Sequence, residues 1–200
     1  MRSIYLVRHG ETDWNREERL QGSLDVPLNA VGIRQANILA RRLKDRRIRR
    51  IFSSPLARAH QTAAIISSKY SSLPSIQDDL REIDHGVWGG MSMKAIQDRY
   101  PDLMAVWRQE PDRLCLDRAE PLETVYARTI RFLLGLLGSA VDEDVVVVGH
   151  GVTNSLILCA VTGLAIRRLG EFVQPNASTT VLRTHSRSIV SMEGLTDDFI

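Results

Sequence analysis

Two histidines stand at the same position relative to two apolar segments. His9 lies just beyond residues 3–7 (SIYLV), and His150 follows the run DVVVVG at 144–149, with a glycine after each histidine. Such runs are typical of buried parallel strands, and open parallel sheets bind ligands beyond the carboxyl ends of their strands. If these strands are neighbours, we expect both imidazoles to face one crevice. The alternative is that each histidine only belongs to a strand-to-helix turn.

Two arginines accompany the histidines. Arg8 directly precedes His9, and Arg58 falls in the first turn of a helix expected to begin at Pro55, with Ser54 as its N-cap. A helix N-terminus favours anions rather than cations, so an arginine there points to an anionic ligand. The alternative for Arg58 is an ordinary surface arginine.

A carboxylate completes the set. Glu82 lies in LREIDHGVWGG at 80–90, and a carboxylate near positive groups can be a general acid or base. A salt bridge to Arg81 or Arg58 is the alternative. Two histidines, two arginines and one carboxylate suit phosphoryl transfer, because a neutral imidazole can attack phosphorus while arginines hold the non-bridging oxygens.

Other ligand chemistries lack their motifs. None of the five histidines shows HxxxH or HExxH spacing, so we expect no metal site. The GHG at 149–151 lacks the third glycine of a dinucleotide fingerprint, since Asn154 stands there, and no GxxxxGK[ST] occurs. A Rossmann or P-loop nucleotide site is therefore not expected, and no cofactor is implied.

Helices are expected to alternate with the strands. The pattern predicts an α/β domain with a mostly parallel sheet. Helices are expected at 29–46 (with Asn29 as N-cap), from Pro55 to about Lys69, at 121–138 and at about 153–162, and further strands at 48–53, 75–79, 179–184 and 188–193.

The segment between Glu82 and His150 begins with short, interrupted elements rather than long helices or strands. Residues 91–120 contain short amphipathic pieces interrupted by Pro101 and Pro111. We expect them to form a helical insertion that packs over one end of the sheet and covers the site. A chain of 200 residues suits one domain, here residues 1–200.

Composition limits the partners and the location. The formal charge of +2 is too balanced to indicate nucleic acid or a membrane surface, and no apolar run reaches the length of a transmembrane helix. Cys115 and Cys159 are far apart and fit no metal or redox motif. We expect a cytoplasmic protein. The final strand pair would offer a sheet edge for a homodimer.

Five segments, in order, carry a resemblance to a known family. RHGETDWN at 8–15 resembles the signature of the histidine phosphatase superfamily, in its phosphoglycerate mutase-like branch. The family's order continues with QG at 21–22, SSPLARAHQTA at 53–63, LREIDHGVWGG at 80–90 and VVVVGHG at 145–151. The resemblance spans nearly the whole chain. It implies a three-layer α/β/α sandwich and a reaction that needs no metal.

The resemblance also implies roles for the five residues named above. His9 would be the phosphorylated nucleophile, and Arg8, Arg58 and His150 would hold the phosphoryl group. Glu82 would protonate the leaving oxygen and then activate water. In another branch an aspartate after the second histidine is the acid, but here Gly151 occupies that place, which favours Glu82.

Further residues enter through the same resemblance. Asn15 resembles an asparagine that contacts the phosphoryl group, the Gly151 amide would do the same, and the Gly10 carbonyl would orient the His9 ring. Three more belong to the implied substrate site: Gln21 and Gly22 of the QG motif, and His85, which would contact a substrate carboxylate.

The family contains both phosphatases and mutases. Its cofactor-dependent phosphoglycerate mutases resemble this chain but carry a longer insertion with paired arginines. Here the insertion contains no adjacent pair, only Arg99, Arg108, Arg113 and Arg118. We therefore expect a phosphatase. The alternatives are a mutase that works through a bisphosphoglycerate and a non-catalytic phosphate-binding member.

The substrate is expected to be a small phosphorylated metabolite. EIDHGVWGGM at 82–91 and YPDLMAVWRQEP at 100–111 resemble metal-independent phosphoserine phosphatases. Phosphoserine and sugar or glycerate phosphates are the candidates. Selectivity is expected from the insertion and the loop at 170–178, with four residues considered as lining: Trp88, Met91, Trp107 and Asn176.

Overall fold

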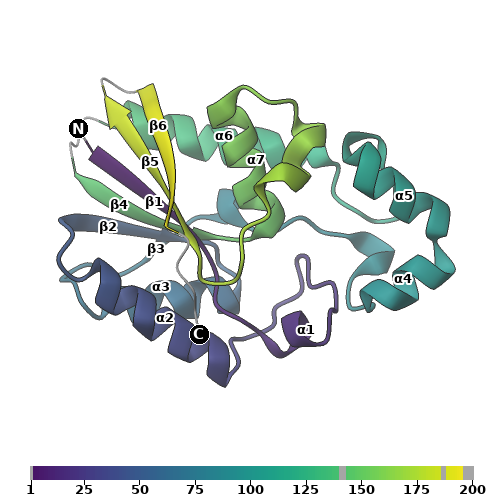
Figure 1. Ribbon diagram of the computed structural model, residues 1–200, viewed down its shortest axis with the longest axis horizontal. Helices are drawn as coiled ribbons and strands as arrows, with labels where there is room; N and C mark the ends of the chain where they lie inside the picture. Colours follow the sequence, from purple (N-terminus) through teal and green to yellow (C-terminus); the bar gives the residue numbers. More distant parts are fainter. Residues whose placement is uncertain (1, 140–142, 186–187, 196–200) are drawn as a thin grey trace.

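The computed structural model describes residues 2–139, 143–185 and 188–195. Six strands alternate with helices along the chain, as Figure 1 shows. In chain order the elements are β1 (Arg2–Arg8), α1 (Asp13–Arg16), α2 (Ala30–Leu43), β2 (Ile48–Ser53), α3 (Ala57–Ser67), β3 (Ser75–Ile76), η1 (Asp78–Leu80), η2 (Gly86–Trp88), α4 (Met93–Arg99), α5 (Pro101–Gln109), η3 (Pro111–Arg113), α6 (Leu122–Gly138), β4 (Asp144–Gly149), α7 (Gly151–Thr162), η4 (Ile166–Phe172), β5 (Thr179–His185) and β6 (Ser188–Leu195).

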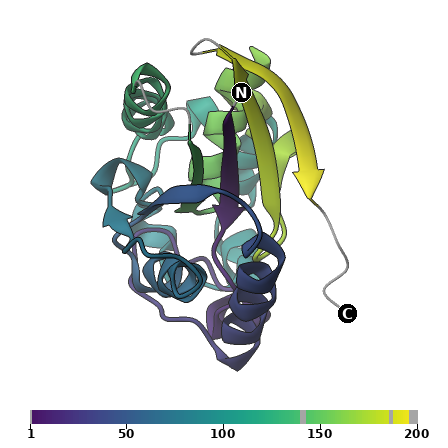
Figure 2. The ribbon, with the colours of Figure 1, turned by 90° about the vertical axis from the view of Figure 1, so that its left-hand side faces the viewer.

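One sheet contains all six strands, in the order β3-β2-β4-β1-β5-β6. The pairs β1–β4, β2–β4 and β2–β3 are parallel, whereas β5 pairs antiparallel with β1 and with β6. β6 forms one edge, as the turned view in Figure 2 shows. The predicted α/β fold is confirmed, with the parallel strands in the half of the sheet that carries His9 and His150.

Helices cover both faces of the sheet. Alternate residues of each strand point to opposite faces, so Tyr5 and Val7 pack with α2 and α3, while Ile4 and Leu6 pack with α6 and α7. Figure 1 shows the two helix pairs on opposite sides of the strands. The fold is therefore the predicted three-layer α/β/α sandwich. Among the described residues, no single helix is long and apolar enough to cross a membrane.

The segment after η2 lies beyond the ends of the strands. α4 and α5 pack on a cluster of their own around Trp88, Ile96 and Met104. Trp88 is thus a core residue, one of the two readings open for it. Figure 1 places both helices to one side of the sheet, past the end at which β1 and β4 finish.

Two expected boundaries are wrong. The helix expected from Pro55 begins at Ala57, with Leu56 as its N-cap, and ends at Ser67. Ser54 is not the N-cap, although its hydroxyl accepts from the amide of Leu56 at 3.3 Å. The same oxygen lies 2.7 Å from Nε2 of His150. The strand expected at 75–79 is limited to Ser75–Ile76, since residues 78–80 form the short helix η1.

Two glycines let α2 begin against the loop that follows β1. A Cβ on Gly32 would lie 2.1 Å from the carbonyl oxygen of Glu11, and one on Gly10 would lie 2.7 Å from the carbonyl oxygen of Gly32. The backbone next to His9 thus touches the first turn of α2, an approach that no side chain permits.

This contact predicts an unusual effect of Gly32→Ala. Alanine in a helix is ordinarily more stable than glycine by about 1 kcal/mol. Here we expect the free energy of unfolding to fall by about 1–3 kcal/mol, because the backbone of Glu11 must shift. Gly135→Ala in α6 is the control, since its Cβ meets nothing within 4 Å and should stabilise. Urea denaturation measures both, and a stabilising Gly32→Ala would contradict the packing.

Candidate active site

The two histidines lie side by side at the carboxyl ends of β1 and β4. Arg8 and Gly149 are register partners in the parallel pair, so His9 and His150 follow paired positions. The amide of His9 donates to the carbonyl of Gly149 at 3.1 Å. The ring centroids are 5.2 Å apart with 58° between the planes. The shared crevice expected from the two apolar runs is therefore present.

The His9 ring is held through one nitrogen. Its Nδ1 lies 2.7 Å from the carbonyl oxygen of Gly10, and a carbonyl only accepts, so the Nδ1 of neutral His9 carries the proton. Nε2 then has a free lone pair. The side chain is 2% exposed. Burial lowers the pKa of His9 well below its ordinary value, and the positive charges of Arg58 and Arg8 lower it further. The ring is thus neutral and nucleophilic at neutral pH.

His150 is held through its other nitrogen. Nε2 lies 2.7 Å from Oγ of Ser54, whereas the buried Nδ1 has no hydrogen-bond partner among the described residues. The pKa of His150 is also well below the ordinary value, first because of burial and then because of Arg58 and His9. An unpartnered buried nitrogen carries a desolvation cost, which a ligand oxygen at this position would remove.

Arg58 is a buried cation rather than a surface arginine. It is 1% exposed, and its guanidinium donates to the carbonyls of Leu24 at 2.8 Å and Gly22 at 2.7 Å. Burial lowers its pKa to about 10, although Glu82 and Asp25 oppose this shift. Neither guanidinium contact is a carboxylate, so the charge is not neutralised by direct pairing.

The guanidinium of Arg8, like that of Arg58, donates to a backbone carbonyl rather than to a carboxylate. Nη1 donates to the carbonyl of Gln174 at 2.5 Å, and burial lowers the pKa of the guanidinium. Its Nε is buried without a partner among the described residues. The floor of the site therefore holds two desolvated guanidinium groups beside two neutral imidazoles, an arrangement suited to an oxyanion.

Glu82 lies at the N-terminus of α7, not in a salt bridge with Arg81 or Arg58. Oε2 accepts from the amide of Val152 at 3.0 Å, and Oε1 accepts from the amide of Thr153 at 3.0 Å. The hydroxyl of Thr153 lies 2.9 Å from Oε1. Amides at a helix N-terminus bind a carboxylate well. Thr153 was not among the predicted site residues, although its place in the first turn after His150 was a usable signal.

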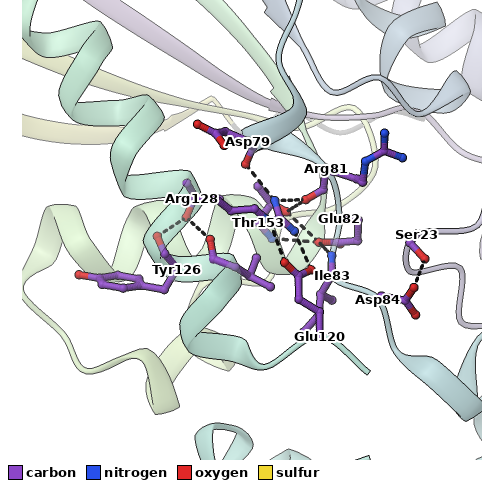
Figure 3. A network of polar contacts seen from close by, with 12 residues as sticks. Ser23, Asp79, Arg81, Glu82, Ile83, Asp84, Glu120, Tyr126, Arg128 and Thr153 are labelled. Atoms are coloured by element: carbon purple, nitrogen blue, oxygen red, sulfur yellow. Dashed lines mark hydrogen bonds and ion pairs between the residues drawn. The ribbon is translucent and has the colours of Figure 1, made fainter. Parts of the chain in front are cut away.

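A partly buried ion pair holds the backbone just before Glu82 (Figure 3). The guanidinium of Arg128 pairs with both carboxylate oxygens of Glu120, at 2.9 and 3.0 Å. Its Nη1 also donates to the carbonyls of Asp79 at 2.9 Å and Arg81 at 2.5 Å. Arg128 thus connects α6 to the segment that presents Glu82, and acts on the site only through position.

We expect Arg128→Ala to lower kcat by about 10- to 100-fold with little change in KM, because a small displacement of Glu82 is costly. Arg128→Lys should recover only part of the loss, since an ammonium cannot make the two-pronged contact with Glu120. Arg131→Ala is the matched control on the same helix, because Arg131 is exposed and pairs with Asp79. Steady-state kinetics with thermal melts test this, and equal kcat in both alanine variants would contradict it.

The structure places the remaining predicted residues at one cavity of about 720 Å³. Its lining includes nine of the ten predicted site residues: Arg8, His9, Asn15, Gln21, Gly22, Arg58, Glu82, His85 and Gly151. The tenth, His150, is not among the lining residues, but its ring lies 5.2 Å from that of His9. Oδ1 of Asn15 accepts from the backbone of Thr12 and from Asn176, whereas its amide nitrogen has no hydrogen-bond partner among the described residues. Asn176 itself does not line the cavity, and supports the His9 carbonyl instead.

His85 and Trp107 meet on the wall of this cavity. Their rings are 5.4 Å apart, edge to face, and burial lowers the pKa of His85. Trp107 therefore lines the site from the end of α5, as considered from the sequence, whereas Met91 does not line it. Among the described residues, no group of three or more histidine, cysteine, aspartate or glutamate side chains is placed to hold a metal ion.

The buried histidines predict how stability depends on pH. The unfolded chain binds protons near the ordinary histidine pKa of 6.5, while folded His9 and His150 stay neutral until lower pH. The stability they provide is full above 6.5 and is lost as the pH falls below it. We expect the unfolding free energy to drop between about pH 7.5 and about pH 5.5, and less so in His150→Gln. An equal drop in both proteins, by urea titration, would contradict this.

Comparison with known proteins agrees with this geometry. Residues 4–194 match the family model of the histidine phosphatase superfamily, branch 1. The chain is 34% identical over 193 residues to phosphoserine phosphatase 1 of Hydrogenobacter thermophilus, covering 96% of this chain and 92% of the relative. It is 33% identical over 176 residues to the probable phosphoglycerate mutase GpmB of Yersinia pestis, covering 84% of this chain and 80% of that relative.

A solved structure of a phosphatase is also similar to this chain over nearly its whole length. The mycobacterial glucosyl-3-phosphoglycerate phosphatase in complex with VO3 matches with a TM-score of 0.86 at 29% identity, over 97% of each chain. This chain therefore belongs to the histidine phosphatase superfamily, as the sequence motifs implied.

Proposed function

We propose that this protein hydrolyses small phosphomonoesters through a phosphohistidine at His9. The observation that carries the proposal is the His9 ring, which is buried, neutral and held by Gly10 through Nδ1, so that Nε2 is directed to the site. Two desolvated arginines and His150 surround it. Attack on an anionic phosphate ester is favoured by a neutral nucleophile, which the ester does not repel, and by fixed positive charges that stabilise its oxygens.

The first step transfers the phosphoryl group to the protein. Nε2 of His9 attacks phosphorus in line with the ester oxygen, while Arg8, Arg58 and Nδ1 of His150 hold the non-bridging oxygens. Asn15 and the amide of Gly151 add hydrogen bonds. The bond between phosphorus and the ester oxygen breaks, and Glu82 gives its proton to that oxygen. The alcohol leaves and Glu82 is ionised.

The second step returns the protein to its starting state. Glu82 removes a proton from a water molecule, and the water oxygen attacks phosphorus opposite Nε2. The bond between phosphorus and nitrogen breaks, and phosphate leaves with His9 neutral again. The amides of Val152 and Thr153 donate to Glu82 and hold its carboxyl group in position for both steps.

Phosphoserine and sugar or glycerate phosphates are the proposed substrates, supported by the names of the phosphatase relatives. A mutase is the second candidate, because one relative is named a probable phosphoglycerate mutase. We favour water as the acceptor of the phosphoryl group, because residues 91–120 lack the adjacent arginine pair found in the insertion of the mutases. Gln21, Gly22 and His85 are proposed to contact the alcohol portion, with His85 facing a carboxylate where one is present.

The test is phosphate release from a panel of these esters in excess EDTA. Release from any of them supports a metal-independent phosphatase, and the ester with the highest kcat/KM defines the substrate class. Exchange of phosphate between glycerate positions that requires a bisphosphoglycerate, without release, would support the mutase. Phosphate bound but neither released nor transferred would indicate a binding protein.

We propose a cytoplasmic location and a homodimer as further properties. Both cysteines are free, which suits a reducing compartment. β6 presents the exposed side chains Val190 and Met192 at the sheet edge, where a second copy would pair. Sedimentation of the purified protein tests the dimer, and a single monomer species at micromolar concentration would refute it.

A further inference from the structure

The cavity carries more positive charge than a phosphoryl group needs. Six arginines and two glutamates are among its lining residues. Arg8 and Arg58 belong to the buried floor beside His9. The remaining four lie away from the floor: Arg19, Arg108, Arg167 and Arg168. Like charges repel one another, so each arginine in such a cluster is stabilised by an acidic partner in the protein or is available to an anionic ligand.

Two of these four arginines already have partners. Arg168 pairs with Glu171, which also lines the cavity. Arg19 pairs with Glu17 and donates to the carbonyl of Gly90. These two therefore have local structural roles and leave little charge for a ligand.

The other two are unpaired. Within the described ranges, neither Arg108 nor Arg167 has an ion pair or a side-chain hydrogen bond, and both are exposed. Arg108 lies in the last turn of α5, whereas Arg167 lies in the first turn of η4, so the two come from segments far apart in sequence. The segments meet because η3, which follows α5, packs against η4. Two solvated cations thus converge on one cavity from different elements, at its exposed rim.

An apolar wall lies on the same cavity. Trp107, Leu169 and Val173 line it, and Val173 is 71% exposed although it is apolar. The site therefore has three parts: a buried cationic floor, a partly apolar wall and a cationic rim. A volume of about 720 Å³ is that of a pocket for a whole small molecule, not for a single phosphate.

We propose that Arg108 and Arg167 form a second anion subsite, and that the preferred substrates are phosphomonoesters with a second anionic group several bonds from the ester phosphate. The second group is a carboxylate or another phosphate, since both accept the two-pronged contact of a guanidinium. This inference rests on the proposed function, because it places the ester phosphate at His9.

Binding to the His9→Ala protein tests the subsite without turnover. The first ligand pair is 6-phosphogluconate and sorbitol 6-phosphate, which differ only in a terminal carboxylate in place of a hydroxymethyl group. The second pair, fructose 1,6-bisphosphate and fructose 6-phosphate, shows whether a phosphate serves instead. Titration calorimetry should give at least about tenfold tighter binding of the doubly anionic member of one or both pairs.

The variants assign this preference to the two arginines. Arg108→Gln with Arg167→Gln should abolish the preference and leave binding of the singly anionic member within about twofold. The control is the double variant Arg34→Gln with Arg99→Gln, which removes the same charge from exposed positions outside the cavity lining. This control should retain the preference for the doubly anionic ligand. The same ratios of kcat/KM in the wild-type background provide a second readout, should the His9 variant fold poorly.

The outcomes separate this inference from the proposed function. Equal binding within both pairs, or a preference that survives loss of both arginines, overturns the subsite. No binding of any of the four compounds overturns it as well. Binding with the expected preference but no phosphate release by the wild type supports the subsite and contradicts the phosphatase.

Discussion

Replacing His9 with alanine is expected to lower the rate of phosphate release by at least about a thousandfold, because the variant lacks the imidazole nitrogen proposed to attack phosphorus. His150 cannot substitute for it. Its Nε2 contacts Ser54, and the fully buried residue is not among those that line the cavity. The arginines would still bind the ester, so affinity should change far less than turnover.

The control for this variant is His185→Ala at the exposed end of β5. It removes a histidine without touching the cavity, and its rate should equal that of the wild type. Thermal melts of both variants separate lost chemistry from lost structure. A folded His9→Ala protein that keeps even a tenth of the wild-type rate would exclude His9 as the nucleophile.

The second large effect is expected for Glu82→Gln. A positioned general acid contributes about 10²–10⁴-fold, so release from alkyl phosphates such as phosphoserine should fall by that amount. An aryl ester such as nitrophenyl phosphate has a leaving group that needs no proton. Its first step should therefore proceed in the variant, while the second step still lacks a base for water.

This difference predicts a burst. The Glu82→Gln variant should release about one equivalent of nitrophenol per site quickly and then turn over slowly, as the phosphorylated protein accumulates. Glu123→Gln, an exposed carboxylate of α6, is the control and should show neither effect. Stopped-flow absorbance measures the burst. Equal losses for alkyl and aryl esters, without a burst, would mean that Glu82 is not the proton donor.

The sheet and the pairing of the two histidines were predictable because they depend on local patterns. VVVV and SIYLV are short apolar runs typical of buried strands, and parallel strands end on the same side of a sheet. His9 and His150 therefore had to meet if the strands were adjacent, which the register of β1 and β4 confirms. Arg58 was found because a cation is unusual in the first turn of a helix.

The errors and omissions arise from contacts between distant residues. Ser-Pro is a good helix start, but the hydroxyl of Ser54 contacts His150, 96 positions away, and the helix begins later. Arg128 reaches the carbonyl of Arg81 across 47 positions. The convergence of Arg108 and Arg167 depends on how η3 packs against η4. No periodicity or motif encodes such tertiary contacts.

The most direct measurement of the central claim is to trap the phosphorylated protein. The wild type is mixed with a rapidly cleaved ester, quenched in alkali within milliseconds, digested and analysed by mass spectrometry. We predict one phosphoryl group on the peptide that contains His9, lost on acid treatment and absent from His9→Ala. A phosphoryl group on another residue, or turnover without any phosphorylated protein, would contradict the account.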